Sequence, residues 1–180
     1  MFIEEFDIAD LKLITPKKFG DSRGFFLESY HQEKYLKSAN ISCSFVQDNI
    51  SMSPKGILRG LHFQKNEFAQ AKLVTVLQGK AFDVAVDLRK NSPTFGQHQS
   101  VVLDSSKIQF FYIPRGFAHG FLSLEDNTLF SYKCDNFYSP ENESGLFYND
   151  PDLNIKWPSS TKFTLSDKDK ILPNFKEFSI

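Results

Sequence analysis

Residues 56–64 combine an arginine and a histidine within an otherwise apolar run. Arg59 supplies a permanent positive charge, and His62 supplies an imidazole, the side chain best suited to proton transfer near neutral pH. In a regular strand these two side chains would point to opposite faces. Gly60 lies between them, and a glycine inside a strand often marks a bulge that redirects its neighbours toward a site. The alternative is a core strand whose polar tips reach solvent.

A second histidine, His119, forms a Pro-x-Gly-x-x-His pattern with Pro114 and Gly116. Two histidines on strands of one chain raise the question of a metal site, which usually needs at least three protein ligands. The first half of such a site would need another histidine where the chain has Gln64, and an amide is a poor substitute for imidazole. Glu67 would contribute only if its loop folded inward. We therefore predict no metal and no cofactor.

The elements that must position these residues are short strands separated by turn sequences. Residues 82–88 alternate cleanly, with Phe82, Val84, Val86 and Leu88 expected on the core face. Further strands are expected at residues 25–30, 45–50, 56–64, 72–77, 99–103, 108–113, 119–124 and 128–134. Helices are few, at residues 32–38 and after an N-cap at Ser166. This pattern predicts an all-β antiparallel jelly roll with short peripheral helices.

Size and composition restrict the possible functions. At 180 residues, the chain 1–180 is expected to form a single domain. Its 21 Lys and Arg residues nearly balance 22 Asp and Glu, and no basic stripe indicates a nucleic-acid partner. No apolar run is long enough to span a membrane, and the first residues lack the features of a signal peptide, so we predict a cytoplasmic protein. Cys43 and Cys134 are then expected as free thiols.

Several motifs occur in a defined order along the chain. They are residues 21–28 (DSRGFFLE), 47–51 (QDNIS), 58–64 (LRGLHFQ), 72–74 (KLV), 84–89 (VAVDLR), 113–121 (IPRGFAHGF), 132–133 (YK) and 165–169 (LSDKD). Each is weak alone, but in this order they resemble the dTDP-4-dehydrorhamnose 3,5-epimerase family, metal-independent members of the cupin superfamily. The resemblance implies a cupin-type jelly roll, a homodimer, and an isomerase of dTDP-rhamnose synthesis for cell-surface polysaccharides such as lipopolysaccharide.

The resemblance also implies a reaction, the conversion of dTDP-4-dehydro-6-deoxy-D-glucose to dTDP-4-dehydro-L-rhamnose by inversion at C3 and C5. Both carbons flank a ketone, so a proton can leave one face to form an enolate and return to the other. By resemblance the catalytic residues are His62 as base, Asp169 as its partner, Tyr132 as acid and Lys72 at the enolate oxygen. From the residues alone, Asp169 is equally a helix-capping residue, and Tyr138 competes with Tyr132. Asp83 is either a counter-ion for Lys72 or a solvated strand residue.

A nucleoside diphosphate requires guanidinium groups and a stacking surface. Arg23 and Arg59 are the candidates for the diphosphate, and Gln47 and Asn49 share one strand face. The substrate-binding residues we predict are Phe19, Arg23, Phe26, Glu28, Gln47, Asn49, Arg59, His119 and Tyr138. Phe19, Phe26 and Glu28 resemble the base-binding edge of the family, which the neighbouring subunit of a dimer contributes. Residues 1–30 are therefore expected as a strand-exchange arm, and residues 140–180 as a C-terminal extension.

Three alternatives stay open at this stage. The nearest is the same scaffold acting at C3 only, or on another nucleotide-linked 4-keto sugar or heptose. Inversion at C5 requires the sugar ring to move so that C5 lies under the same base as C3 did. This alternative therefore differs from the leading hypothesis only in the geometry of the pocket. The second is a metal-dependent cupin enzyme, and the third is a jelly roll that binds a sugar nucleotide without catalysis.

Overall fold

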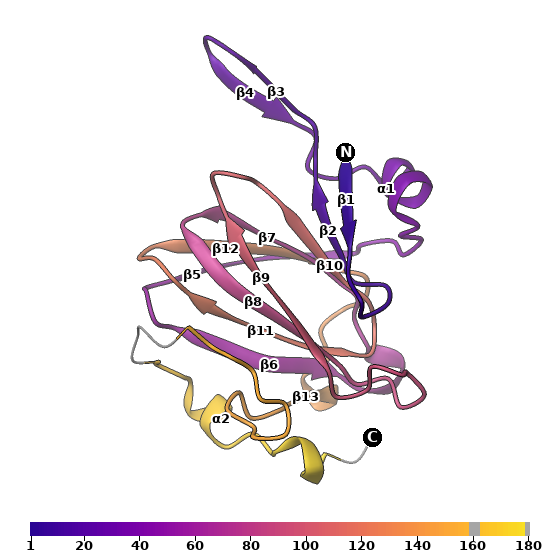
Figure 1. The fold of residues 1–180 in the computed structure, drawn as a ribbon, viewed down its shortest axis with the longest axis vertical. Helices are drawn as coiled ribbons and strands as arrows, with labels where there is room; N and C mark the ends of the chain where they lie inside the picture. Colours follow the sequence, from indigo (N-terminus) through magenta and orange to yellow (C-terminus); the bar gives the residue numbers. More distant parts are fainter. Residues whose placement is uncertain (159–162, 179–180) are drawn as a thin grey trace.

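The computed structural model describes residues 1–158 and 163–178, which form two antiparallel sheets packed face to face (Figure 1). The six-stranded sheet has the order β1 (Phe2–Glu5), β2 (Lys12–Thr15), β10 (Phe110–Ile113), β7 (Lys72–Gln78), β12 (Thr128–Cys134) and β5 (Gln47–Ser53). The five-stranded sheet has the order β13 (Glu143–Gly145), β6 (Leu58–Gln64), β11 (Phe117–Ser123), β8 (Lys80–Asp87) and β9 (His98–Asp104). The predicted jelly roll is confirmed.

The main core lies between these sheets. It is built from buried side chains of both, among them Val74, Ala85, Leu103, Phe111 and Phe130. Strand β8 is buried on both faces, because Ala81 and Ala85 face this core while Val84 and Val86 pack beneath the C-terminal segment. The prediction that only the Phe82–Val84–Val86 face is apolar core was therefore incomplete.

The C-terminal segment covers the outer face of the five-stranded sheet (Figure 1). Its residues Leu146, Leu153 and Ile155 pack against Leu61 of β6 and the outward side chains of β8. The short helix α2 (Asp167–Lys170) follows, with the Ser166 side chain as its predicted N-cap. The remaining short helices are η1 (Asn66–Phe68), η2 (Pro140–Asn142) and η3 (Phe175–Glu177). This packing places α2 beside β6.

The N-terminal part of the chain, where a strand-exchange arm is expected, contains short strands followed by a helix. Strands β1 and β2 pair with each other, and β2 also pairs with β10. The hairpin of β3 (Lys18–Asp21) and β4 (Gly24–Leu27) then extends away from the sandwich (Figure 1). Helix α1 (Gln32–Ala39) packs its Tyr35 and Ala39 on the outer face of the six-stranded sheet. The predicted strand at 25–30 therefore ends early, because the hairpin turns into this connection.

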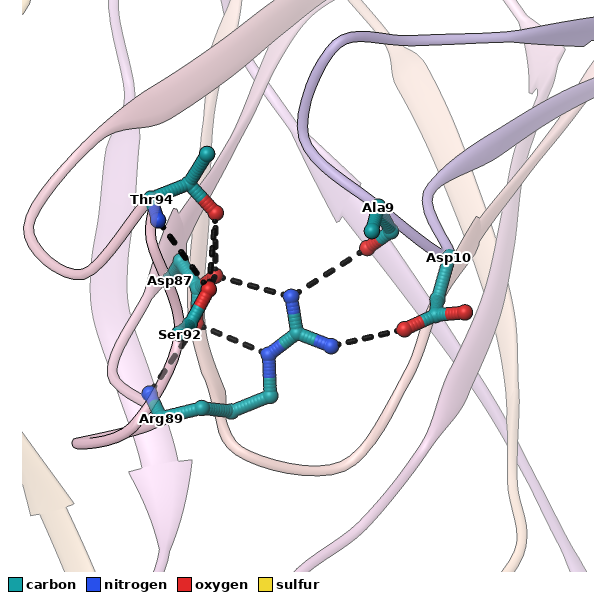
Figure 2. A network of polar contacts seen from close by, with 6 residues as sticks. All are labelled: Ala9, Asp10, Asp87, Arg89, Ser92 and Thr94. Carbon is teal, nitrogen blue, oxygen red and sulfur yellow. Dashed lines mark hydrogen bonds and ion pairs between the residues drawn. The ribbon is translucent and has the colours of Figure 1, made fainter.

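A buried ion pair connects the two sheets at β8 (Figure 2). The carboxylate of Asp87 accepts hydrogen bonds from Arg89 Nη2 at 2.8 Å, Ser92 Oγ at 2.6 Å and Thr94 Oγ1 at 2.7 Å. Burial alone would raise the pKa of Asp87, but these donors outweigh it and lower the pKa to about 2. Arg89 Nη1 also binds Asp10 Oδ2, in the connection between β1 and β2, at 2.7 Å. The network thus fastens the end of β8 to the opposite sheet.

Two further observations bear on the sequence-based predictions. Cys43 and Cys134 are free, as predicted. No helix among the described residues is long and apolar enough to cross a membrane.

Candidate active site

A bulge in β6 brings Arg59 and His62 to the same cavity. His119 of β11 pairs with His62, whereas Phe121, two residues later, pairs with Arg59, so β6 contains one extra residue. Gly60 lies at this point with φ +119°, a conformation that favours glycine. A Cβ atom on Gly60 would lie 2.8 Å from the carbonyl oxygen of His119. The predicted role of Gly60 is confirmed, since the bulge breaks the alternation that would separate the two side chains.

The cavity has two lobes that share His62, Lys72 and Tyr132. The larger, about 430 Å³, is called the arginine lobe; its other polar lining residues are Ser51, Arg59, His119, Thr164, Ser166, Lys168 and Asp169. The smaller, about 370 Å³, is called the amide lobe; its other polar lining residues include Gln47, Asn49, Gln64, Gln70, Tyr138 and Glu143. Together the lobes have the size of a site for a nucleotide-linked sugar.

His62 forms a short hydrogen bond with Asp169, 2.6 Å between Nε2 and Oδ1. Helix capping does not compete with this contact, because the cap uses the backbone N–H of Asp169, which donates to Ser166 Oγ. Burial raises the pKa of Asp169, but the hydrogen bond from His62 and the N–H of Gly60 outweigh it, so the pKa is lowered. An ionised carboxylate only accepts, so Nε2 of His62 carries the proton and Nδ1 is left with a lone pair.

A second histidine–aspartate pair lies deeper in the same cavity. His119 Nε2 lies 2.9 Å and 3.1 Å from the two carboxylate oxygens of Asp83, and both residues are buried. Burial lowers the pKa of His119 despite the nearby carboxylate. Asp83 is thus neither a solvated residue nor hydrogen-bonded to Lys72, although its charge acts to raise the pKa of Lys72. The sequence analysis missed this pair because it assigned the apolar face of β8 alone to the core.

Lys72 and Tyr132 present unpaired polar groups to the cavity. Among the described residues, neither the ammonium of Lys72 nor the hydroxyl of Tyr132 has a hydrogen-bond partner in the structure. Burial lowers the pKa of Lys72 and raises the pKa of Tyr132. The phenol therefore keeps its proton at neutral pH and can donate it, and the ammonium is poorly compensated and attracts negative charge.

The amide lobe is organised by hydrogen bonds from β5 to the chain after β12. Gln47 Nε2 donates to Asn49 Oδ1 at 3.0 Å, and Gln47 Oε1 accepts from the backbone N–H of Tyr138 at 2.9 Å. The Tyr138 hydroxyl donates to Glu143, which also binds Lys168. Tyr138 lies outside β12 and is exposed, so it does not share the buried position of Tyr132. Glu143 and Lys168 are lining residues to which the sequence analysis assigned no role. Lys168 lies within the motif 165–169, whereas Glu143 stands in a polar segment without a recognisable pattern.

The structure does not bring every predicted residue to this cavity. Arg59, His119, Gln47, Asn49 and Tyr138 line it together with the four predicted catalytic residues. Four others lie on or directly after the β3–β4 hairpin; they are Phe19, Arg23, Phe26 and Glu28. Within the chain, the guanidinium of Arg23 is paired with Asp21, and the carboxylate of Glu28 is paired with Lys34. Their predicted role toward a neighbouring subunit stays a prediction.

No group of three or more His, Cys, Asp or Glu residues in the described part of the chain is arranged to hold a metal ion. Comparison with known proteins then gives the family. The model of the dTDP-4-dehydrorhamnose 3,5-epimerase family matches residues 5–177. This chain belongs to that family.

Individual relatives agree with the family assignment. The chain is 47% identical over 173 residues to dTDP-4-dehydrorhamnose 3,5-epimerase of Salmonella typhimurium, covering 96% of this chain and 94% of the relative. A crystal structure of dTDP-6-deoxy-D-glucose-3,5-epimerase from Legionella pneumophila in complex with dTDP-4-keto-L-rhamnose has a TM-score of 0.95 at 47% identity, covering 99% of this chain and 94% of that one. A 3'-monoepimerase from Streptomyces bikiniensis with bound dTDP-quinovose has a TM-score of 0.88 at 32% identity, covering 94% and 85%. The protein is an isomerase of the cupin type.

Proposed function

We propose that His62 and Tyr132 act on opposite faces of a 4-keto sugar that is bound between them. The reaction of the family, inversion at C3 and C5 of a dTDP-linked 4-keto-6-deoxy sugar, is the activity of this chain. The observation that carries the residue assignment is the His62–Asp169 hydrogen bond at the point where the two lobes meet. It leaves one ring nitrogen free to take a proton while the other is held by a carboxylate.

In the first step, Nδ1 of His62 removes the proton from C3. The carboxylate of Asp169 stabilises the imidazolium that forms, as in other histidine–carboxylate pairs. Negative charge then develops on the C4 oxygen, and the ammonium of Lys72 stabilises it. This interaction is strong because Lys72 is held in a partly apolar cavity without another hydrogen-bond partner among the described residues.

In the second step, Tyr132 returns a proton to the opposite face of C3. Burial raises the pKa of Tyr132, so its hydroxyl is protonated at neutral pH and ready to donate. Proton exchange with solvent returns His62 to its neutral form and Tyr132 to its protonated form. Reseating the ring so that C5 lies under the same base then repeats the sequence at the second centre. His119, held by Asp83, is proposed to hydrogen-bond the sugar from the floor of the arginine lobe.

The nucleotide is bound by polar groups at the edges of both lobes. Arg59 presents its guanidinium to the diphosphate. Gln47 and Asn49 supply amide groups in the amide lobe, and the exposed ring of Tyr138 supplies a stacking surface. No metal or other cofactor is needed for this chemistry, because a buried ammonium supplies the positive charge.

A homodimer completes the site in this proposal. Phe26 on the β3–β4 hairpin is 68% exposed, and it lines a surface hollow together with Phe19 and Arg23. The rings of Phe19 and Phe26 in this hollow offer a stacking surface for the base of a nucleotide bound by the partner. On β5, Ile50 and Met52 are 66% and 59% exposed, which supports an apolar contact between copies. Residues 1–30 then act as an exchanged arm of a single domain that spans 1–180, with 140–180 as its extension. Two free cysteines fit a cytoplasmic protein.

Solvent isotope exchange tests the proposed function directly. The purified protein is incubated with dTDP-4-keto-6-deoxyglucose in D2O, and the product is analysed by NMR and mass spectrometry. We expect two deuterons, one at C3 and one at C5. A single deuteron at C3 would identify a C3 epimerase, the activity that the Streptomyces bikiniensis relative carries in its name. Binding of the nucleotide sugar without any exchange would contradict catalysis.

A further inference from the structure

Two serines of β5 have no role in the proposed reaction; Ser51 lines the arginine lobe, and Ser53 contacts Arg59, which lines it. Ser51 and Ser53 are two residues apart, so their side chains share one face of the strand. The hydroxyl of Ser53 is buried and accepts a hydrogen bond from Arg59 Nε at 3.2 Å. The hydroxyl of Ser51 lines the lobe, and its oxygen is buried without a hydrogen-bond partner. Buried hydroxyls are usually paired, so an unpaired one in a cavity wall is suited to hydrogen-bond a ligand bound there.

The contact with Ser53 determines how Arg59 presents its guanidinium. Only Nε is engaged, and among the described residues the two terminal nitrogens have no hydrogen-bond partner. A guanidinium is planar, so a hydrogen bond at Nε fixes the plane in which the four remaining N–H groups lie. Phosphate oxygens are bound best by such a fork when its orientation is already set.

We infer that these serines complete the binding site for the hexosyl diphosphate part of the substrate. Ser53 is a positioning residue that orients the guanidinium of Arg59, and the hydroxyl of Ser51 hydrogen-bonds an oxygen of the ligand. That oxygen belongs to a sugar hydroxyl or to a phosphate, either of which accepts a hydrogen bond from the serine hydroxyl. The inference rests on the proposed function for the identity of the ligand.

Ser123 provides a matched control for Ser51. Among the described residues these two have the buried hydroxyls without a partner, and Ser123 does not line either lobe. Ser51→Ala is expected to raise KM for the keto sugar nucleotide about tenfold, the effect of one lost ligand hydrogen bond. Ser123→Ala makes the same chemical change and should leave KM unaltered. Equal KM and equal dTDP affinity in the two variants and the wild type would overturn the role of Ser51.

Calorimetric titration with dTDP alone identifies the ligand oxygen. If Ser51 contacts a phosphate, Ser51→Ala weakens dTDP binding as well as raising KM. If it contacts a sugar hydroxyl, dTDP binds as tightly as to the wild type while KM still rises. Both results support the contact and assign it to one part of the substrate.

A double-mutant cycle tests whether Ser53 acts through Arg59. Ser53→Ala should lower kcat/KM about tenfold, mainly through KM, and Ser53→Thr, which keeps the hydroxyl, should restore it. In an Arg59→Lys background, Ser53→Ala should cause no further loss, because lysine has no Nε to orient. The same loss in both backgrounds would show a merely structural effect and overturn the positioning role.

Failure of this inference is distinguishable from failure of the proposed function. A wild-type protein that incorporates no deuterium from D2O would contradict the function itself. An active wild type whose Ser51→Ala variant behaves like Ser123→Ala would leave the function intact and contradict only the serine assignment. Thermal unfolding of each variant checks that the fold is unchanged.

Discussion

The cavity contains two histidine–aspartate pairs that differ mainly in burial. In the first, the side chain of His62 is 30% exposed and that of Asp169 is 4% exposed. In the second, the side chain of His119 is 7% exposed and that of Asp83 is fully buried. The hydrogen-bond lengths, 2.6 Å and 2.9 Å, are similar. The same two residue types are therefore placed in environments that favour different chemistry.

The buried pair is also held more firmly by the backbone than the partly exposed pair. Asp83 and His119 stand on neighbouring strands β8 and β11, locked by a continuous ladder of backbone pairing. His62 stands on β6, whereas Asp169 comes from α2, 107 residues later in the chain. A partly exposed imidazole can accept a proton and pass it on, but a buried one is kept neutral by the cost of desolvating its charge. This difference supports the proposal that the first pair transfers protons and the second provides a fixed dipole.

The largest expected effect follows from removing the proposed base. His62→Ala should lower kcat by roughly 10² or more, since general base catalysis contributes about 10²–10⁴-fold. Steady-state kinetics and deuterium exchange at C3 measure this, with circular dichroism as the check on folding. Unchanged turnover in a folded variant would remove His62 from the mechanism. Loss of exchange in His119→Ala with exchange retained in His62→Ala would reverse the two roles.

Replacing Tyr132, the proposed acid on the opposite face of the sugar, should have the next largest effect on kcat. Tyr132→Phe should lower kcat by roughly 10², because the phenolic proton donor is lost while the ring is kept. Deuterium exchange at C3 is expected to survive better than inversion, since abstraction by His62 is still possible. Equal slowing of exchange and inversion would weaken the assignment of Tyr132 as acid.

Disrupting the buried His119–Asp83 pair should lower the free energy of unfolding. His119→Ala leaves the carboxylate of Asp83 buried without its partner, so we expect a loss of about 3 kcal/mol in the free energy of unfolding. Urea denaturation measures this difference. His62→Ala is the matched control and should cost less, because its aspartate keeps the N–H of Gly60. Equal losses would mean that burial does not separate the two pairs.

Replacing each carboxylate by an amide sharpens the comparison without removing an imidazole. Asp169→Asn offers His62 a group that can donate as well as accept, so the correct tautomer is no longer enforced. We expect kcat to fall by about tenfold or more, since orientation of the base is part of general base catalysis. Asp83→Asn should change kcat less and stability more. The opposite ranking of the two variants in kcat would contradict the assignment.

The smallest expected effect is on the pH dependence of stability, because the two histidine–aspartate pairs should lose their contributions over different pH ranges. Burial lowers the pKa of His119 from its ordinary value of 6.5. As pH falls, the unfolded chain therefore takes up this proton at a higher pH than the folded protein does. The contribution of His119 to stability is complete above pH 6.5 and is lost as pH falls toward the lowered pKa. The pKa of Asp169 is lowered from 3.8, where the hydrogen bond from His62 outweighs burial, so its contribution is lost only in stronger acid.

Urea unfolding between about pH 7 and about pH 5 measures the contributions of histidines, because carboxylates stay ionised there. His119→Gln should flatten the loss of stability over this range. His98→Gln is a necessary comparison, since burial lowers the pKa of His98 as well. An unchanged slope in His119→Gln would show that His119 does not titrate differently in the folded protein.

Much of the site was predictable from local sequence. Alternation of apolar residues predicted the strands, and Gly60 predicted the bulge because only glycine adopts its backbone geometry without strain. The motif around Ser166 predicted the cap of α2. The ordered motifs from Asp21 to Asp169 predicted the family, which the match over residues 5–177 confirms. These properties depend on a few neighbouring residues or on their order, so the sequence alone determined them.

Other properties depended on the packing of distant segments. A strand pattern separates two faces but does not say what covers each, so the burial of Asp83 follows only from the packing of its face of β8, which it shares with Ala81 and Ala85, against the opposite sheet. The contact of Arg59 with Ser53 joins two strands that lie in different sheets. The tertiary structure alone decided these contacts, because burial and hydrogen bonding between distant residues depend on how the two sheets and the C-terminal segment come together.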